Sequence, residues 1–241
     1  MYKRQVSGAG SLTLTSEGGY PTLFAPGDIT FDGVTVDITG DQVGIFSNEV
    51  YDEVEEDYIP TAVTMRNATV DIDVSAGDSQ AVYCFYGSIT IEDTVLTTTT
   101  STTEESENYA LYVDGDLLIK GDKTDIKHTG GIGFDADTIT IEGGKVDVKS
   151  NDTALLGYSG VTISGGAVKA ESTNSYAILG TKGTVSITGA DTEVTAITGS
   201  EDFAAISNAN HPNNPTFGDG GIHLDAKITV QGKNLIVISR I

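Results

Sequence analysis

A repeat of about 22 residues constrains the fold of this 241-residue chain more than any other feature of its sequence. The repeat is centred on an apolar–polar–apolar triplet, and two of its copies read DADTITIEGGKVDVKSNDTALLG and YSGVTISGGAVKAESTNSYAILG. Triplets of this type begin at Ile29, Ile89, Leu117, Ile139, Val161, Val185 and Ile228. Such a period is typical of solenoids, in which each repeat buries its apolar side chains against its neighbours.

Each copy contains three short alternating stretches: the triplet, a Val-x-Val strand such as Val146/Val148, and an Ala-x-Leu strand such as Ala154/Leu156. Gly, Asp, Asn and Ser between them are turn residues. Because each strand type recurs once per repeat, stacked repeats pair like strands in parallel. We therefore predict an all-β fold, a single right-handed parallel β-helix over residues 1–241 with about eight coils. A β-sandwich is the alternative, and the regular copies argue against it.

The third strand of each repeat is apolar at both alternating sets of positions. We expect one set to point inward as a column: Tyr83, Tyr112, Phe134, Leu156, Leu179, Ile206 and Leu224. The other set would then form an outward apolar stripe: Tyr109/Leu111, Thr153/Leu155, Tyr176/Ile178 and Phe203/Ala205. Inserted loops covering the stripe, sugar stacking on its tyrosines, and a protein interface such as a homo-oligomer all remain open.

Three segments interrupt the period: residues 47–60, 97–108 and 207–220. Solenoids place such insertions as loops, often beside the binding face.

The composition excludes several classes of partner. The formal charge is −22, from 35 acidic and 13 basic residues, which disfavours a nucleic-acid partner. No apolar run reaches the length of a membrane span, so we expect no membrane insertion. The single cysteine, Cys84, excludes an internal disulfide.

The strings TIEGGKVDV, TISGGAVKA, STNSYAILG and GDGGIHLDA resemble bacterial cell-surface β-helix carbohydrate-binding proteins. This family includes clostridial proteins that bind calcium and polygalacturonate, and its fold is similar to that of the pectate lyases. The resemblance covers roughly residues 110–232. It implies an extracellular module of a longer secreted protein, which recognises acidic plant or cell-wall polysaccharide with the help of Ca²⁺.

Aspartates gather at the corner after the Ala-x-Leu strand, and further ones in the last coil match the family's acidic motif. The candidate metal ligands are Asp114, Asp116, Asp135, Asp137, Asp219 and Asp225. Crowded carboxylates repel one another unless a cation or solvent screens them, and calcium prefers oxygen ligands. A hydrated acidic edge is the alternative interpretation. At the opposite end of the strand, Asn151, Asn174 and Glu201 are expected to stack, with the asparagines forming a hydrogen-bonded ladder or part of a calcium site.

Lysines concentrate on the outward side of the Val-x-Val strands, where we expect two lysine columns flanking an acidic one. Lys127 and Lys149 would pair there with uronate carboxylates, or else form ordinary charge pairs across a solvated sheet. Tyr109, Tyr176 and His223 complete the candidate ligand-binding residues.

No catalytic motif is present. Lyases of the similar fold require a base that abstracts a proton beside a calcium-bound carboxylate, usually with an arginine. This chain has only Arg4, Arg66 and Arg240. The sequence therefore favours a binding module, with a non-catalytic adhesin stalk and a polysaccharide lyase as alternatives. Outward threonines such as Thr138 and Thr140 are a weak indication of an ice-binding surface.

Overall fold

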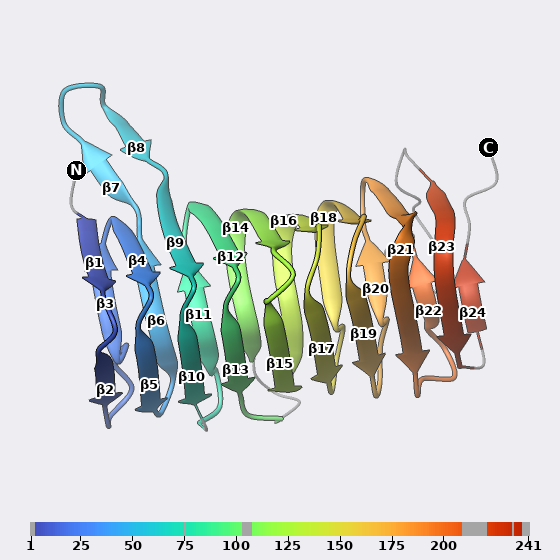
Figure 1. The fold of residues 1–241 in the computed structure, drawn as a ribbon, viewed down its shortest axis with the longest axis horizontal. Helices are drawn as coiled ribbons and strands as arrows, with labels where there is room; N and C mark the ends of the chain where they lie inside the picture. Colours follow the sequence, from blue (N-terminus) through green and yellow to red (C-terminus); the bar gives the residue numbers. More distant parts are fainter. Residues whose placement is uncertain (1–2, 75, 103–107, 209–220, 233, 238–241) are drawn as a thin grey trace.

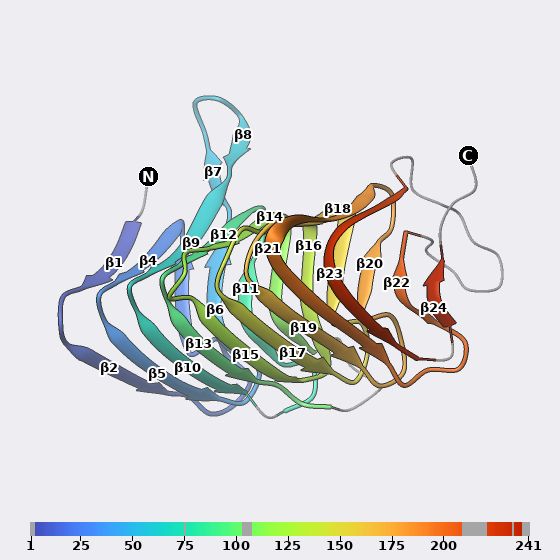
Figure 2. The ribbon, with the colours of Figure 1, turned by 45° about the vertical axis from the view of Figure 1, so that its right-hand side comes forward.

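The computed structural model describes residues 3–74, 76–102, 108–208, 221–232 and 234–237, and every element among them is a β-strand. The strands lie side by side along one long axis, with the chain progressing from one end to the other (Figure 1). The coils have three faces around a common interior (Figure 2). The prediction of an all-β parallel solenoid is confirmed, whereas its hand and number of coils remain predictions.

The three faces differ in which strand of each repeat they contain. The first face contains β1 (Lys3–Ser7), β4 (Asp28–Asp32), β9 (Thr61–Arg66), β12 (Gly87–Glu92), the ends of β14 (Tyr109–Lys120), β16 (Ile132–Ile141) and β18 (Leu155–Ile163), and the starts of β21 (Thr184–Thr198) and β23 (Ile222–Gln231). The second contains β2 (Ser11–Thr15), β5 (Thr35–Gly40), β10 (Thr69–Val74), β13 (Val95–Thr99), β15 (Asp125–Gly130), β17 (Lys145–Ser150), β19 (Ala167–Ser172) and the ends of β21 and β23. The third contains β3 (Leu23–Pro26), β6 (Val43–Asn48), β11 (Gln80–Cys84), the starts of β14, β16 and β18, then β20 (Ile178–Gly180), β22 (Ala204–Ser207) and β24 (Asn234–Val237).

Neighbouring strands within each face are parallel, as expected when identical strand types stack. The described exception is the antiparallel pair β7 (Val50–Asp52) and β8 (Asp57–Ile59), which belongs to the insertion at residues 47–60. This hairpin projects beyond the edge of the solenoid (Figure 1). The other two insertions lie partly outside the described residues.

The triplets and the Val-x-Val strands form the core as predicted. Ile89 and Ile91 of β12 pair with Leu117 and Ile119 of β14, and all four are buried. Val146 and Val148 of β17 are also buried. Each apolar side chain thus lies on an equivalent one in the next coil.

Two triplet assignments need correction. Val63-Thr64-Met65 in β9 is a first-face triplet that the repeat alignment missed; it pairs with Ile29-Thr30-Phe31. Ile228-Thr229-Val230 was aligned with the first face but pairs with Val194 and Ala196 on the second. Residues 222–224 continue the first face instead, where Leu224 pairs with Ile187 and is 37% exposed.

On the third face, the predicted inward and outward sets are partly reversed. Phe134, Leu179 and Ile206 are buried as predicted, but most of the outward set is buried as well. Leu111, Leu155 and Ile178 are fully buried, whereas their neighbours Tyr83, Tyr112 and Leu156 are only half-buried and share one register column with Asp135. The predicted outward apolar stripe is therefore mostly core. It does not offer the surface on which a homo-oligomer was expected.

The reversal arises at the corner that precedes each third strand. Two successive residues there point inward, such as Ala81-Val82 and Ala154-Leu155, so the alternation begins one residue later than the sequence suggests. The first of each pair is small because the corner is tight. A Cβ added at Gly133 would lie 2.0 Å from the Ala154 carbonyl oxygen.

Substitutions at Leu155 and Leu156 test this corrected phase. Leu155→Ala should lower the free energy of unfolding by about 2–5 kcal/mol, because it leaves a cavity in the core. Leu156→Ala should cost about 1 kcal/mol or less, since its side chain is half-buried on the outer surface. Urea denaturation of both variants measures the difference, and a larger loss at Leu156 would contradict the observed phase.

Candidate functional site

A column of aromatic rings runs along the outer side of the third face. Phe24, Phe46, Tyr83 and Tyr112 occupy equivalent positions on β3, β6, β11 and β14. The ring centroids are 5.4 Å apart for Phe24–Phe46, 5.2 Å for Phe46–Tyr83 and 4.8 Å for Tyr83–Tyr112. The last two rings are nearly parallel, at 17°. The strand spacing therefore turns one position of the repeat into a continuous aromatic surface.

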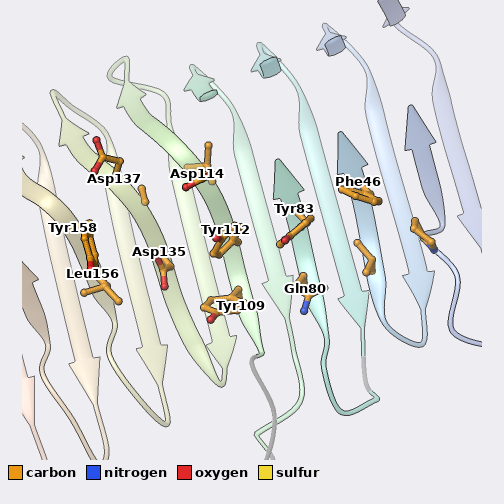
Figure 3. A pocket seen from close by; sticks show the side chains of 14 residues that line it. Phe46, Gln80, Tyr83, Tyr109, Tyr112, Asp114, Asp135, Asp137, Leu156 and Tyr158 are labelled. Atoms are coloured by element: carbon orange, nitrogen blue, oxygen red, sulfur yellow. The ribbon is translucent and has the colours of Figure 1, made fainter. Parts of the chain in front are cut away.

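Three carboxylates lie where this column ends. Asp135 occupies the register position next to Tyr112, and Asp114 and Asp137 lie beyond them on β14 and β16 (Figure 3). Asp137 Oδ1 accepts a hydrogen bond of 2.6 Å from Ser159 Oγ. Leu156 and the half-exposed Tyr158 of β18 follow on the next coil.

These side chains line one pocket of about 700 Å³, which we call the aromatic groove. It comprises Pro21, Val43, Phe46, Gln80, Tyr83, Tyr109, Tyr112, Val113, Asp114, Asp135, Ala136, Asp137, Leu156 and Tyr158. None of these described lining residues is Lys or Arg. An apolar concave surface with a few convergent polar groups is the usual form of a ligand site.

The groove brings together part of the predicted site. Asp114, Asp135, Asp137 and Tyr109 all line it, although Tyr109 is only 7% exposed and packs against Tyr112 at 5.2 Å. Sequence reasoning missed Phe46, Tyr83, Tyr112 and Tyr158 as site residues. For Phe46, Tyr83 and Tyr112 the signal was the recurrence of an aromatic at one repeat position, but Tyr83 and Tyr112 had been assigned to the core.

The remaining metal candidates lie elsewhere. Asp116 accepts a hydrogen bond from Thr138 on the first face, and Asp225 is on β23 of the same face. Asp219 lies outside the described residues. Within the described part of the chain, no three Asp, Glu, His or Cys side chains are grouped closely enough to hold a metal ion. Calcium binding by the aspartates of the groove stays a prediction.

Tyr176 does not reach the groove. Its side chain is 4% exposed and packs against Phe203 with a centroid distance of 4.9 Å. Burial raises the pKa of its hydroxyl, and the hydroxyl has no hydrogen-bond partner within the described structure. The expected sugar-stacking role of Tyr176 is wrong, because the corner turns this residue inward.

The lysines on the second face do not form two columns. In one column, Asp147 lies between Lys127 and Lys169 of the two neighbouring coils. In the next column, Lys149 lies between Thr129 and Glu171. Each lysine therefore lies opposite an acidic residue of the neighbouring coil. Lys169 Nζ is 2.9 Å from Glu171 Oε2, and this bond lowers the pKa of Glu171 and raises that of Lys169. The register favours the interpretation as ordinary cross-strand charge pairs.

Two further predicted residues are on other faces. His223 is exposed on the first face, where it pairs with Ser186, and is not part of the groove. Asn174 Nδ2 donates a hydrogen bond of 3.0 Å to Asn151 Oδ1, which confirms the expected ladder for this pair.

Outward threonines of neighbouring coils do stack, as Thr30, Thr64 and Thr90 show. Charged residues, among them Arg66 and Glu92, form the neighbouring column. The stacked threonines therefore do not form the uniform surface that an ice-binding function would need.

Comparison with known proteins identifies no relative: no family model, curated protein or solved structure matches this chain. The assignment of a function therefore depends on the groove itself. The described residues contain no helix of the length and apolarity needed to cross a membrane.

His128 is a buried histidine, and its titration tests whether the interior of the solenoid excludes charge. It is 2% exposed, its Nδ1 is 3.0 Å from Thr98 Oγ1, and burial lowers its pKa from 6.5 to about 4. Between these two values the unfolded chain binds a proton that the folded chain excludes. The free energy of unfolding should therefore fall as the pH decreases, by about 1.4 kcal/mol per unit from this group.

The measurement is the free energy of unfolding at several pH values for the wild type and His128→Gln. The variant should lose this part of the slope between about pH 6.5 and pH 4. His223→Gln, which removes an exposed histidine, is the control and should keep the slope. Identical slopes in all three proteins would contradict the assignment of a buried neutral His128.

Proposed function

We propose that this protein is a non-catalytic, glycan-binding β-solenoid and that the aromatic groove on its third face is the binding site. The observation that carries the proposal is the column of Phe46, Tyr83 and Tyr112, open to solvent and ending at three carboxylates. A contiguous apolar patch that reaches the surface and is bordered by polar groups usually marks an interaction site.

The two parts of the groove suit the two parts of a sugar. A pyranose ring has an apolar C–H face that packs on an aromatic ring, and the tyrosine hydroxyls keep contact with water. Asp114, Asp135 and Asp137 are acceptors for sugar hydroxyl groups. The groove runs across several coils, so it suits a polymer better than a single sugar unit.

An acidic polysaccharide such as polygalacturonate is the ligand that the sequence resemblance implies. The groove is itself anionic, so a uronate needs a bridging cation such as calcium, which takes carboxylate oxygens as ligands. A location at the bacterial cell surface, in a longer secreted protein, belongs to the same proposal. So does the right-handed helix of about eight coils.

Two alternatives from the sequence fit the groove less well. A passive stalk gives no reason for a half-buried aromatic column that lines a groove. A lyase requires a base beside the substrate carboxylate, and the described lining residues include no Lys or Arg for that role.

Affinity electrophoresis on glycan-containing gels, including polygalacturonate with calcium or with EDTA, tests the proposal. Wild-type protein should be retarded by at least one glycan, and Tyr112→Ala should weaken that binding about tenfold or more, because it removes the ring that adjoins the carboxylates. Tyr51→Ala, which removes an exposed ring from the hairpin, should leave it unchanged. Loss of binding in both variants, or in neither, would place the site elsewhere; no retardation by any glycan would favour the stalk.

Mobility on polygalacturonate that is the same with calcium and with EDTA would exclude the calcium-assisted acidic ligand.

A further inference from the structure

We infer that the aromatic groove selects glycans that carry protonated amino groups, that is, polymers of amino sugars with free amines. This inference rests on the proposed glycan-binding function and names the ligand class. It replaces a uronate bridged by calcium with a sugar that brings its own positive charge.

The charge of the groove is the first argument. Asp114, Asp135 and Asp137 come from two adjacent strands and line the same pocket, with no Lys or Arg among its described lining residues. Asp114 and Asp137 are exposed to solvent, so a ligand can reach both carboxyl groups. An ammonium group placed among them gains charge-assisted hydrogen bonds, whereas a carboxylate placed there is repelled. The formal charge of −22 adds a long-range attraction for a cationic polymer.

The tyrosines of the groove are the second argument, because aromatic faces attract ammonium groups. The protein contains such a contact at the edge of the groove: Lys182 Nζ lies 4.4 Å from the centroid of the Tyr158 ring. Tyr112 and Tyr83 offer the same chemistry two and three strands away, and Tyr112 adjoins the carboxylates. A ring that packs on the sugar and a carboxylate that neutralises its amine thus lie side by side.

The test compares two ligands of equal backbone: an oligomer of β-1,4-linked glucosamine and its fully N-acetylated form. Calorimetry at about pH 5.5, where the free amines of the oligomer are protonated, measures the affinity for each ligand. Wild-type protein should bind the free-amine oligomer at least about tenfold more tightly. This preference should decrease in added salt, which screens the charges. Millimolar calcium should also weaken binding of this oligomer, since it competes for the carboxylates.

Three variants assign the effect to side chains. Asp135→Asn/Asp137→Asn should abolish the preference and keep the weaker binding of the acetylated oligomer, because Asn retains size and an acceptor oxygen for Ser159. Asp122→Asn/Asp191→Asn removes the same charge from the corners between the first and second faces and should keep the preference. Tyr112→Ala should weaken binding of both oligomers.

The outcomes separate this inference from the proposed function. Equal binding of the two oligomers, or a preference that survives Asp135→Asn/Asp137→Asn, would overturn the selection for amines while a Tyr112-dependent affinity upholds the glycan site. A calcium-dependent affinity for polygalacturonate that exceeds the affinity for the free-amine oligomer would overturn it as well. Binding of no glycan at all would overturn both proposals.

Discussion

Parallel stacking of equivalent strands is the constraint on which the rest of this structure depends. Each residue lies about 4.8 Å from its counterpart in the next coil, so any position of the repeat becomes a column. Isoleucine and valine columns form the core, paired asparagines form a ladder, and lysines lie opposite acids. A residue type that recurs at one position of the repeat therefore forms a continuous row along the axis. The aromatic groove is built on one such row.

The repeat made the fold class predictable, because alternation and turn residues agree in each copy. It also located the buried triplets and the Val-x-Val strands. What the sequence did not reveal was where the alternation restarts after a corner. Ala154 and Leu155 both point inward, and this one-residue shift moves Leu156 from the expected core to the surface. Periodicity describes a straight strand and contains no information about a bend.

The same limit applies to the candidate site. Asp114, Asp135 and Asp137 were found from the crowding of acidic residues at one corner and from the family resemblance, neither of which requires an exact register. The aromatic rings of the groove and the lysine–acid pairs depend on how neighbouring coils align. Lys127 lies opposite Asp147 because the coils are offset by two residues from the alignment used for the sequence. Such an offset leaves every side chain on the same face, so hydrophobic patterning does not detect it.

The aromatic column also presents its rings at a fixed spacing. Its rings are fixed to a sheet whose strand spacing cannot change without breaking the backbone hydrogen bonds of every coil. A chain molecule lying along the axis meets contacts at that fixed interval, whereas one lying across the strands meets a single ring and its neighbours. Linkage and pitch of a polymer, and not only the chemistry of its units, therefore decide how many rings it can use at once.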